Sequence, residues 1–344
     1  MTPSRSGSIL SRPILSHDLP FDLNTERVVR IRRRAADALR AAETFIRPDR
    51  AVGFEEVALP PAVVDDSATD LSWLSEEASS LLRPLPTVIP VIGSGVSKHA
   101  GLPDGEELAL WMAASPLATG ITFERPRDCL HVADRIVDNK LVRELELQRE
   151  VASDLSLSHR SYQLTDTLLS IVHAPSRLIV TFNYDLLAEE AAAAERVAFR
   201  SLSRDEIHEA TDHLRNPPGE LLIVHLHGHV NKPETMILAA PMYMKHVNDG
   251  FIRTFLTALI NTRTLCFMGL SLDEEYILNG LLEAAFLNPR HVYVGDKSGV
   301  DALRASRYRH GLSIADFPSR EWHRLDDFSR TIFGPPLNLP IEVS

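Results

Sequence analysis

Cysteine is scarce in this chain of 344 residues, which contains only Cys129 and Cys266. Two cysteines cannot form a four-cysteine zinc site or a disulfide framework. Cys266 lies in the apolar run 264–268 and is expected to be a small core residue. Cys129 follows Asp128 in a helical pattern, so a reactive role for either thiol is the less favoured interpretation.

Long apolar runs and excess positive charge are also missing. No stretch of about eighteen apolar residues occurs, so the sequence predicts no membrane span. Residues 1–20 lack an unbroken apolar segment and a small-residue cleavage site, so we expect a cytoplasmic protein. The net charge of −11 gives no general attraction to nucleic acid or anionic lipid. A solvated face is favoured over a nucleic-acid site for six arginines of one predicted helix, which are Arg27, Arg30, Arg32, Arg33, Arg34 and Arg40.

The ends of the chain differ from its middle. Residues 1–22 are rich in Ser, Arg and Pro and are predicted to be a loose tail. Helical spacing predicts a helix over 25–46 and a short one over 73–82. We therefore predict an N-terminal tail and helical appendage over 1–85, acting in assembly or regulation, and a C-terminal tail over 331–344.

The middle of the chain, residues 86–330, alternates between apolar runs and helical patterns. Such alternation predicts an α/β fold, a doubly wound, Rossmann-like parallel sheet covered on both faces. The interval 105–177 holds helical patterns over 106–114, 129–145 and 162–172 but no convincing strand, so we place a helical insertion there. The predicted strands are 88–92, 178–182, 221–226, 265–269, 291–294 and 312–317, and the helices between them 186–196, 251–259, 274–287 and 300–309.

Polar or glycine-rich residues follow four of these strands, at the sheet edge where open α/β folds bind nucleotides. The first group is Gly93-Ser94-Gly95 with Ser97, followed by Gly101-Leu102-Pro103-Asp104. Glycine lets a backbone approach a diphosphate closely, although a tight turn without a ligand is equally compatible. Lys98 breaks the dehydrogenase pattern Gly-x-Gly-x-x-Gly, and no Walker motif follows.

The second group is Asn183-Tyr184-Asp185. The Asn183 amide is both donor and acceptor, which suits ribose hydroxyls or a bound water. Asp185 is placed to accept a hydrogen bond from a ligand amide, or simply to cap the helix that follows.

The third group is His225-Leu226-His227-Gly228, and the fourth is Gly269-Leu270-Ser271. A histidine near neutral pKa can take a proton from a hydroxyl or a water, although a single such histidine is more often structural. A metal site is an alternative interpretation of His225, His227 and His229. No nearby carboxylate is spaced to complete such a site, so we predict no metal. Gly269 and Ser271 are suited to contact a ribose or a phosphate group of a ligand.

Taken in order, the four groups resemble the sirtuin superfamily over about residues 85–330, and its bacterial NAD glycohydrolase branch more than the protein deacylases. The resemblance implies NAD+ as substrate and no metal. It implies catalytic roles for Asn183, which would hold the nicotinamide ribose, and for His227, the general base. The NAD+-binding residues that it implies are Gly93, Ser94, Gly95, Ser97, Pro103, Asp104, Asp185, Gly269 and Ser271.

The chain departs from the deacylase pattern. Phe182 replaces the glutamine before the Asn, Gly105 replaces the Phe after Pro-Asp, and the four-cysteine ribbon is missing. We therefore predict NAD+ hydrolysis to nicotinamide and linear or cyclic ADP-ribose. An NAD+ or ADP-ribose sensor without turnover is the alternative, and a protein deacylase is less favoured. The resemblance further implies a regulated, NAD-depleting effector of bacterial anti-phage defence, forming a homo-oligomer or a complex with a partner such as a helicase-like translocase.

Overall fold

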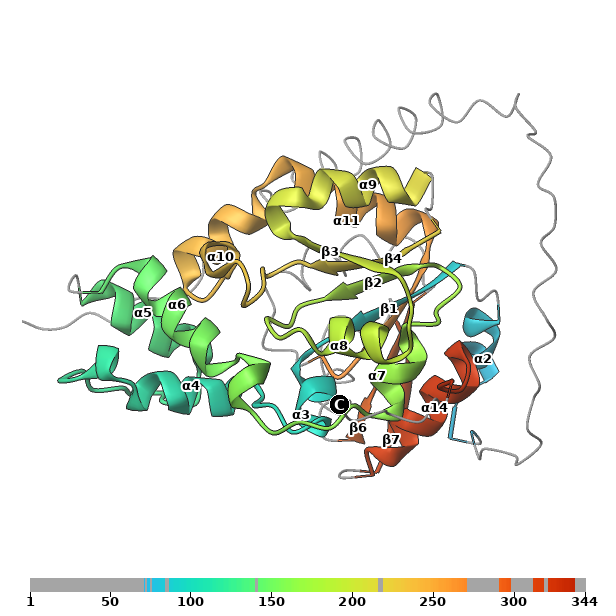
Figure 1. Ribbon diagram of the computed structural model, residues 1–344, viewed down its shortest axis with the longest axis horizontal. Helices are drawn as coiled ribbons and strands as arrows, with labels where there is room; N and C mark the ends of the chain where they lie inside the picture. The colour runs from blue at the N-terminus through green and yellow to red at the C-terminus, as the bar shows by residue number, and fades with distance from the viewer. Residues whose placement is uncertain are drawn as a thin grey trace, which may run out of the picture. The chain divides into compact units, whose positions relative to one another are not determined.

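The fold is a seven-stranded, fully parallel sheet with helices on both faces (Figure 1), as the alternation of strands and helices predicted. The computed structural model describes residues 71, 73–74, 76–83, 87–139, 142–215, 219–270, 291–297, 312–318 and 321–337. All of them lie in the second of two compact units, Ala62–Ser344. The strands are β1 (Val88–Ile92), β2 (Leu178–Thr181), β3 (Phe199–Ser203), β4 (Leu221–His225), β5 (Thr264–Met268), β6 (His291–Asp296) and β7 (Leu312–Phe317).

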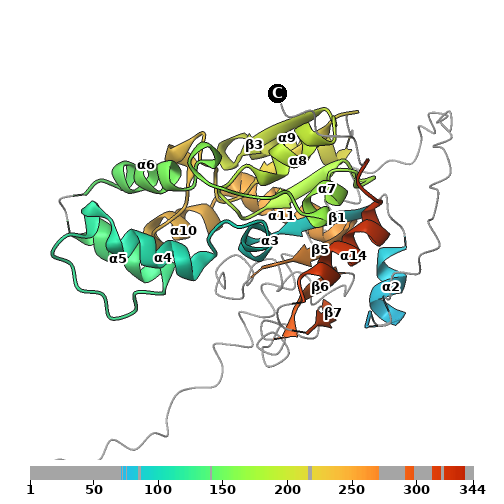
Figure 2. The same ribbon diagram turned by 60° about the horizontal axis from the view of Figure 1, so that its bottom comes forward.

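Two separate cores cover the two faces of this sheet, because successive side chains of a strand point to opposite sides. Ile89 and Val91 of β1 join one core. This core includes Ile207 of α9 (Ile207–Arg215) and Phe255 of α11 (Gly250–Thr262). Val88 and Ile92 join the other core, which faces five helices (Figures 1 and 2). These are α2 (Glu76–Leu82), α3 (Ser94–His99), α7 (Asp166–Ile171), α8 (Leu187–Ala194) and α14 (His323–Phe333).

A third core lies in a helical lobe beyond the carboxyl ends of the strands (Figure 2). It joins side chains of the segment between β1 and β2, such as Met112, Ile136 and Leu147, to Ile237 and Met242 from the segment after β4. The helices of this lobe are α4 (Gly105–Ala114), α5 (Cys129–Asp138), α6 (Glu144–Asp154) and α10 (Ala240–Val247). The carboxyl edge of the sheet is therefore enclosed by elements from two distant parts of the chain.

The strand order places a topological switch point between β1 and β5. The order is β3-β4-β2-β1-β5-β6-β7, so β2, β3 and β4 lie on one side of β1 and the chain then crosses to β5 on the other. Open α/β sheets bind ligands at such a point, outside the carboxyl ends of the strands. The residues after β1 and β5 are Gly93 and Gly269, respectively.

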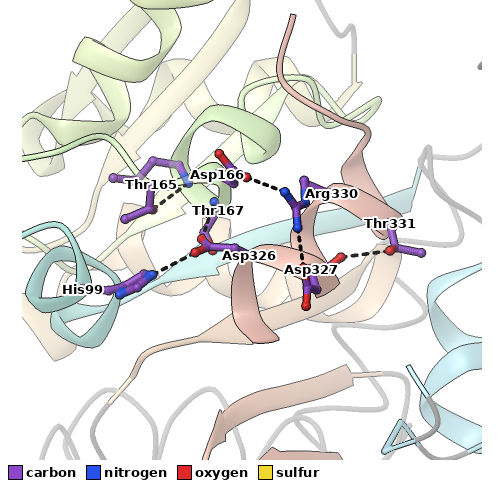
Figure 3. Close-up of polar contacts among 9 residues, drawn as sticks. His99, Thr165, Asp166, Thr167, Asp326, Asp327, Arg330 and Thr331 are labelled. Atoms are coloured by element: carbon purple, nitrogen blue, oxygen red, sulfur yellow. Dashed lines mark hydrogen bonds and ion pairs between the residues drawn. The ribbon is translucent and has the colours of Figure 1, made fainter. Parts of the chain in front are cut away.

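Helix α14 is tied to two helices of its sheet face by one carboxylate (Figure 3). Asp326 accepts the backbone N–H of Thr167 at 2.8 Å and its hydroxyl at 2.7 Å, and lies 2.9 Å from Nε2 of His99. Arg330 pairs with Asp166 at 2.7 Å and with Asp327. His99 also stacks on Trp322, so the end of α3 is held by α14.

Two local predictions need correction. The strand β3 was not expected, because Phe199 and Arg200 are exposed at the sheet edge and the segment lacks an apolar run. The helical pattern predicted from Cys129 through residue 145 is broken, because α5 ends at Asp138 and α6 starts after a capping box of Arg143 with Glu146. The helical patterns over 25–46, 274–287 and 300–309 lie outside the described residues. Within the described ranges, no helix has the length and apolar character to cross a membrane.

Candidate functional site

Four predicted residues meet at the carboxyl ends of β1 and β2, and we call them the Asn183 cluster: Gly93, Ser97, Asn183 and Asp185. The Asn183 amide donates to the carbonyl of Gly93 at 3.0 Å and to Oγ of Ser97 at 2.8 Å. Ser97 in turn donates to Oδ2 of Asp185 at 2.7 Å. The sheet brings them together because β1 and β2 are paired neighbours whose carboxyl ends meet at the same edge.

The Asp185 carboxyl is buried, and each of its two oxygens accepts a hydrogen bond. Its Oδ1 accepts the backbone N–H of Leu187, the first residue of α8, at 3.1 Å, although Leu186 and not Asp185 is the N-cap of this helix. Its Oδ2 faces Ser97. Burial raises the pKa of Asp185, and the hydrogen bond from Ser97 only partly offsets this. A carboxyl whose charge is disfavoured in this way gains from a ligand that donates a hydrogen bond to it.

The glycines after β1 and β5 are in contact with each other. Gly95 donates its N–H to the carbonyl of Gly269 at 2.8 Å. Added Cβ atoms on Gly93 and Gly95 would lie 2.8 and 2.9 Å from backbone atoms of residues 269 and 270. Gly269 has φ +62, and its Cβ would lie 2.5 Å from the backbone nitrogen of Val96. The backbones of these glycines therefore pack against each other at the switch point. The Gly95 N–H already has a hydrogen-bond acceptor, the Gly269 carbonyl.

His227 lies in an aromatic shell beside the Asn183 cluster. Its ring is 5.1 Å from Phe182 and 6.3 Å from Tyr184, the residues on either side of Asn183. Tyr243 and His246 of α10 lie 5.2 and 5.9 Å from it on edge. Within the described residues, His227 and Asn183 share no hydrogen bond or ring contact. Burial, His246 and Arg204 hold the pKa of His227 well below its usual range, so the ring is a neutral base at pH 7.

His225, the other histidine of that motif, belongs to the framework. It lies within β4, fully buried, and its Nδ1 is 2.9 Å from the carbonyl oxygen of Asn183. Its Nε2 is 2.7 Å from Oε1 of Glu189 on α8, which also accepts the hydroxyl of Ser201 at 2.6 Å. This chain of contacts fixes the backbone that presents Asn183.

The remaining predicted residues are placed as follows. Asp104 caps α4 in a capping box with Glu107 and pairs with Lys98. Its neighbour Pro103 is half-buried, as is Ser94 at the start of α3. Ser271 lies outside the described residues. In the part of the chain that the structure describes, no three His, Cys, Asp or Glu side chains are grouped to hold a metal ion.

Sequence reasoning missed Glu189, Arg204 and His246. Glu189 stands in an alanine-rich helical pattern, where a glutamate ordinarily faces solvent. Arg204 follows the unexpected strand β3, and His246 lies on α10, which follows no strand directly. No local signal marks these residues, because their importance comes from tertiary contacts alone.

Part of the chain matches a known protein family. Residues 177–311 match the family model of the SIR2-like domain. No curated protein matches the chain. The matched segment contains Asn183, Asp185 and His227, whereas the glycine loop after β1 precedes it. The match supports a relationship to the sirtuin-like superfamily, and with it an NAD-related activity in general.

Proposed function

We propose that this protein is an NAD+ glycohydrolase, which cleaves NAD+ to nicotinamide and ADP-ribose. The observation that carries this proposal is the Asn183 cluster: a buried amide, hydroxyl and carboxyl joined by hydrogen bonds, next to the switch point. A dinucleotide has ribose hydroxyls and a carboxamide, which exchange hydrogen bonds with such groups. The SIR2-like match, which includes Asn183 and Asp185, supports NAD+ as the ligand.

The reaction requires one bond to break and one to form. The bond between the anomeric carbon and the pyridinium nitrogen breaks, and its electron pair neutralises the nicotinamide. The oxygen of a water molecule bonds to the anomeric carbon, and its proton leaves to a base. Asn183 would hold the ribose, Asp185 would accept from the carboxamide, and neutral His227 would take the proton.

Nicotinamide release from NAD+ by the full chain tests this function. Asn183→Ala removes the amide from the cluster, and we expect release to fall at least about a hundredfold because ribose positioning is lost. The matched control is Asn261→Ala, since that side chain only donates to a carbonyl of its own exposed helix turn. Equal release by wild type and Asn183→Ala would refute the proposal.

A sensor that binds NAD+ or ADP-ribose without turnover is the second candidate. One observation favours it, namely that His227 makes no contact with Asn183. A sensor would show ligand-dependent thermal stabilisation with no product, and the stabilisation would be lost in Asn183→Ala.

We extend the proposal to the role of the activity, which is depletion of NAD+ in anti-phage defence under control of self-assembly or of a translocase-like partner. The resemblance of the sequence motifs supports this role. Activity that rises on assembly would be its signature.

A further inference from the structure

A second group of polar side chains lies along the same edge of the sheet, away from the switch point. Arg204 directly follows β3, His227 follows β4, and His246 lies on α10. We call these three residues the basic cluster. β3 and β4 are paired, and α10 lies beyond their carboxyl ends in both views (Figures 1 and 2). The rings of His227 and His246 lie 5.9 Å apart, and the Arg204 charge acts on both of them, so the three side chains share one region.

Several nitrogen atoms of the basic cluster are buried without a hydrogen-bond partner. They are Nδ1 and Nε2 of His246, Nε2 of His227 and Nε of Arg204. His246 and His227 are each 1 % exposed, and their rings lie 5.9 Å apart. A buried polar atom without a partner costs free energy, so natural proteins rarely leave several together.

Arg204 also has no ion-pair partner among the described residues. Its neighbour in sequence, Arg200, pairs with Glu209 at 2.5 Å, whereas Arg204 forms no ion pair anywhere in the described ranges. The nearby Asp249 caps α11, where it accepts two backbone N–H groups. Burial and the Arg204 charge lower the pKa of His246 to about 4. Both histidines are therefore neutral at pH 7, and each has one N–H to donate.

We propose that the basic cluster binds a compact oxyanion, the carboxylate or phosphate group of a small molecule. Arg204 supplies the positive charge, and His227 and His246 each supply one neutral N–H donor, so the anion would satisfy one unpartnered nitrogen of each histidine. Hydrogen bonds from a guanidinium to an oxyanion are among the strong ones in proteins. This binding does not depend on cleavage of NAD+, although His227 would contact both ligands.

Titration calorimetry and thermal unfolding of the full chain, with inorganic phosphate or acetate at constant ionic strength, test the site. We expect saturable binding of one of the two anions and a rise in the unfolding temperature that levels off with concentration. The anion that binds identifies the group as phosphate or carboxylate. General salt effects on stability do not saturate in this way.

Arg204→Gln separates a binding role from a structural one. Since the arginine forms no ion pair within the described residues, we expect the variant to be as stable as wild type without the anion, and to bind the anion at least about tenfold more weakly. Arg253→Gln, an exposed arginine on α11, is the matched control and should bind as wild type does.

His246→Phe provides an independent measurement, because it removes both unpartnered nitrogens while keeping a ring of similar size. It should unfold at the wild-type temperature or above without the anion, and bind the anion more weakly. Absence of saturable binding to wild type, or equal binding by Arg204→Gln, would overturn the proposal. Neither outcome bears on nicotinamide release, so the two proposals fail separately.

Discussion

At the scale of single residues, the clearest feature is the buried pair of His225 and Glu189. Burial lowers the pKa of His225, but Glu189 outweighs this, so the pKa of His225 is raised above 6.5. Burial likewise raises the pKa of Glu189, but His225 outweighs this, and the pKa of Glu189 is lowered below 4.5. Each group favours the charged form of the other, so the pair exists as an ion pair near neutral pH.

Glu189→Gln should lower the free energy of unfolding by about 3 kcal/mol, because it leaves a buried imidazole without its counter-charge. The loss should be largest between pH 4.5 and 6.5. The His225 contribution is complete below 6.5 and disappears as the pH rises through its raised folded pKa. The Glu189 contribution is complete above 4.5 and disappears as the pH falls through its lowered folded pKa. Urea unfolding across this range measures both limits.

The control for this pair is Glu209→Gln, whose partner Arg200 is exposed. An exposed ion pair contributes less than about 1 kcal/mol. A loss as large in Glu209→Gln as in Glu189→Gln would contradict the interpretation.

Sequence alone identified the residues of the Asn183 cluster, because each follows an apolar run and such runs end at one edge of a parallel sheet. The strand pattern did not distinguish His225 from His227, and only the family resemblance favoured His227 as the general base. Both stand in the same motif, and only tertiary contacts show that one is bound to Glu189 while the other lies among aromatic rings. No sequence pattern indicated that Arg204 and His246 lie near His227, because the three residues are distant from one another in sequence.

At the scale of elements, the glycine loop after β1 depends on the turn after β5. Gly269→Ala would force a side chain onto a backbone at φ +62, with its Cβ 2.5 Å from the Val96 nitrogen. We expect a loss of at least about 1–2 kcal/mol in unfolding free energy. Ligand-dependent stabilisation by NAD+ should fall as well, because the loop is displaced.

Gly105→Ala is the comparison for that variant. Gly105 is the first residue of α4, and no atom lies within 4 Å of a Cβ placed there. Alanine at such a position should be neutral or stabilising by about 0.5 kcal/mol. A loss in Gly105→Ala equal to that in Gly269→Ala would show that the contact with Val96 is not the cause.

Helix α14 offers a second test at this scale (Figure 3). Asp326→Ala removes the acceptor of the Thr167 N–H and hydroxyl, and we expect a loss of about 2 kcal/mol. Burial raises the pKa of Asp326, but hydrogen bonds from His99 and Thr167 outweigh this and lower it. Its contribution is therefore complete above pH 3.8 and disappears as the pH falls through the lowered value. Asp327→Ala, beside an exposed Arg330, should cost less than about 1 kcal/mol in the same denaturation series.

At the scale of the whole molecule, the alternation of apolar runs predicted the class of fold, and the seven parallel strands confirm it. Strand order was not predictable, because runs of similar apolar character are interchangeable until the connections are known. The edge strand β3 was missed for a related reason, since its outer residues are exposed and need no apolar pattern.

The short helix α2 limits how many N-terminal residues can be removed, because it contributes to the core. Ala78 and Leu82 are buried in the core of one sheet face, and Trp73 contacts the rings of Phe317 and Phe328. We expect removal of residues 1–61 to preserve the unfolding temperature, and removal of residues 1–85 to lower it. Light scattering and nicotinamide release by the shorter deletion then test whether the N-terminal residues control assembly and activity. Unchanged mass and rate would eliminate that control.

The bond between the Gly95 N–H and the Gly269 carbonyl has a consequence for mapping ligands by deuterium uptake. The amide proton of Gly95 is hydrogen-bonded before any nucleotide arrives, so we expect it to exchange slowly in the free protein. A bound nucleotide would then add little further protection at this residue. A footprint that omits Gly95 would therefore be compatible with a diphosphate lying directly against the loop.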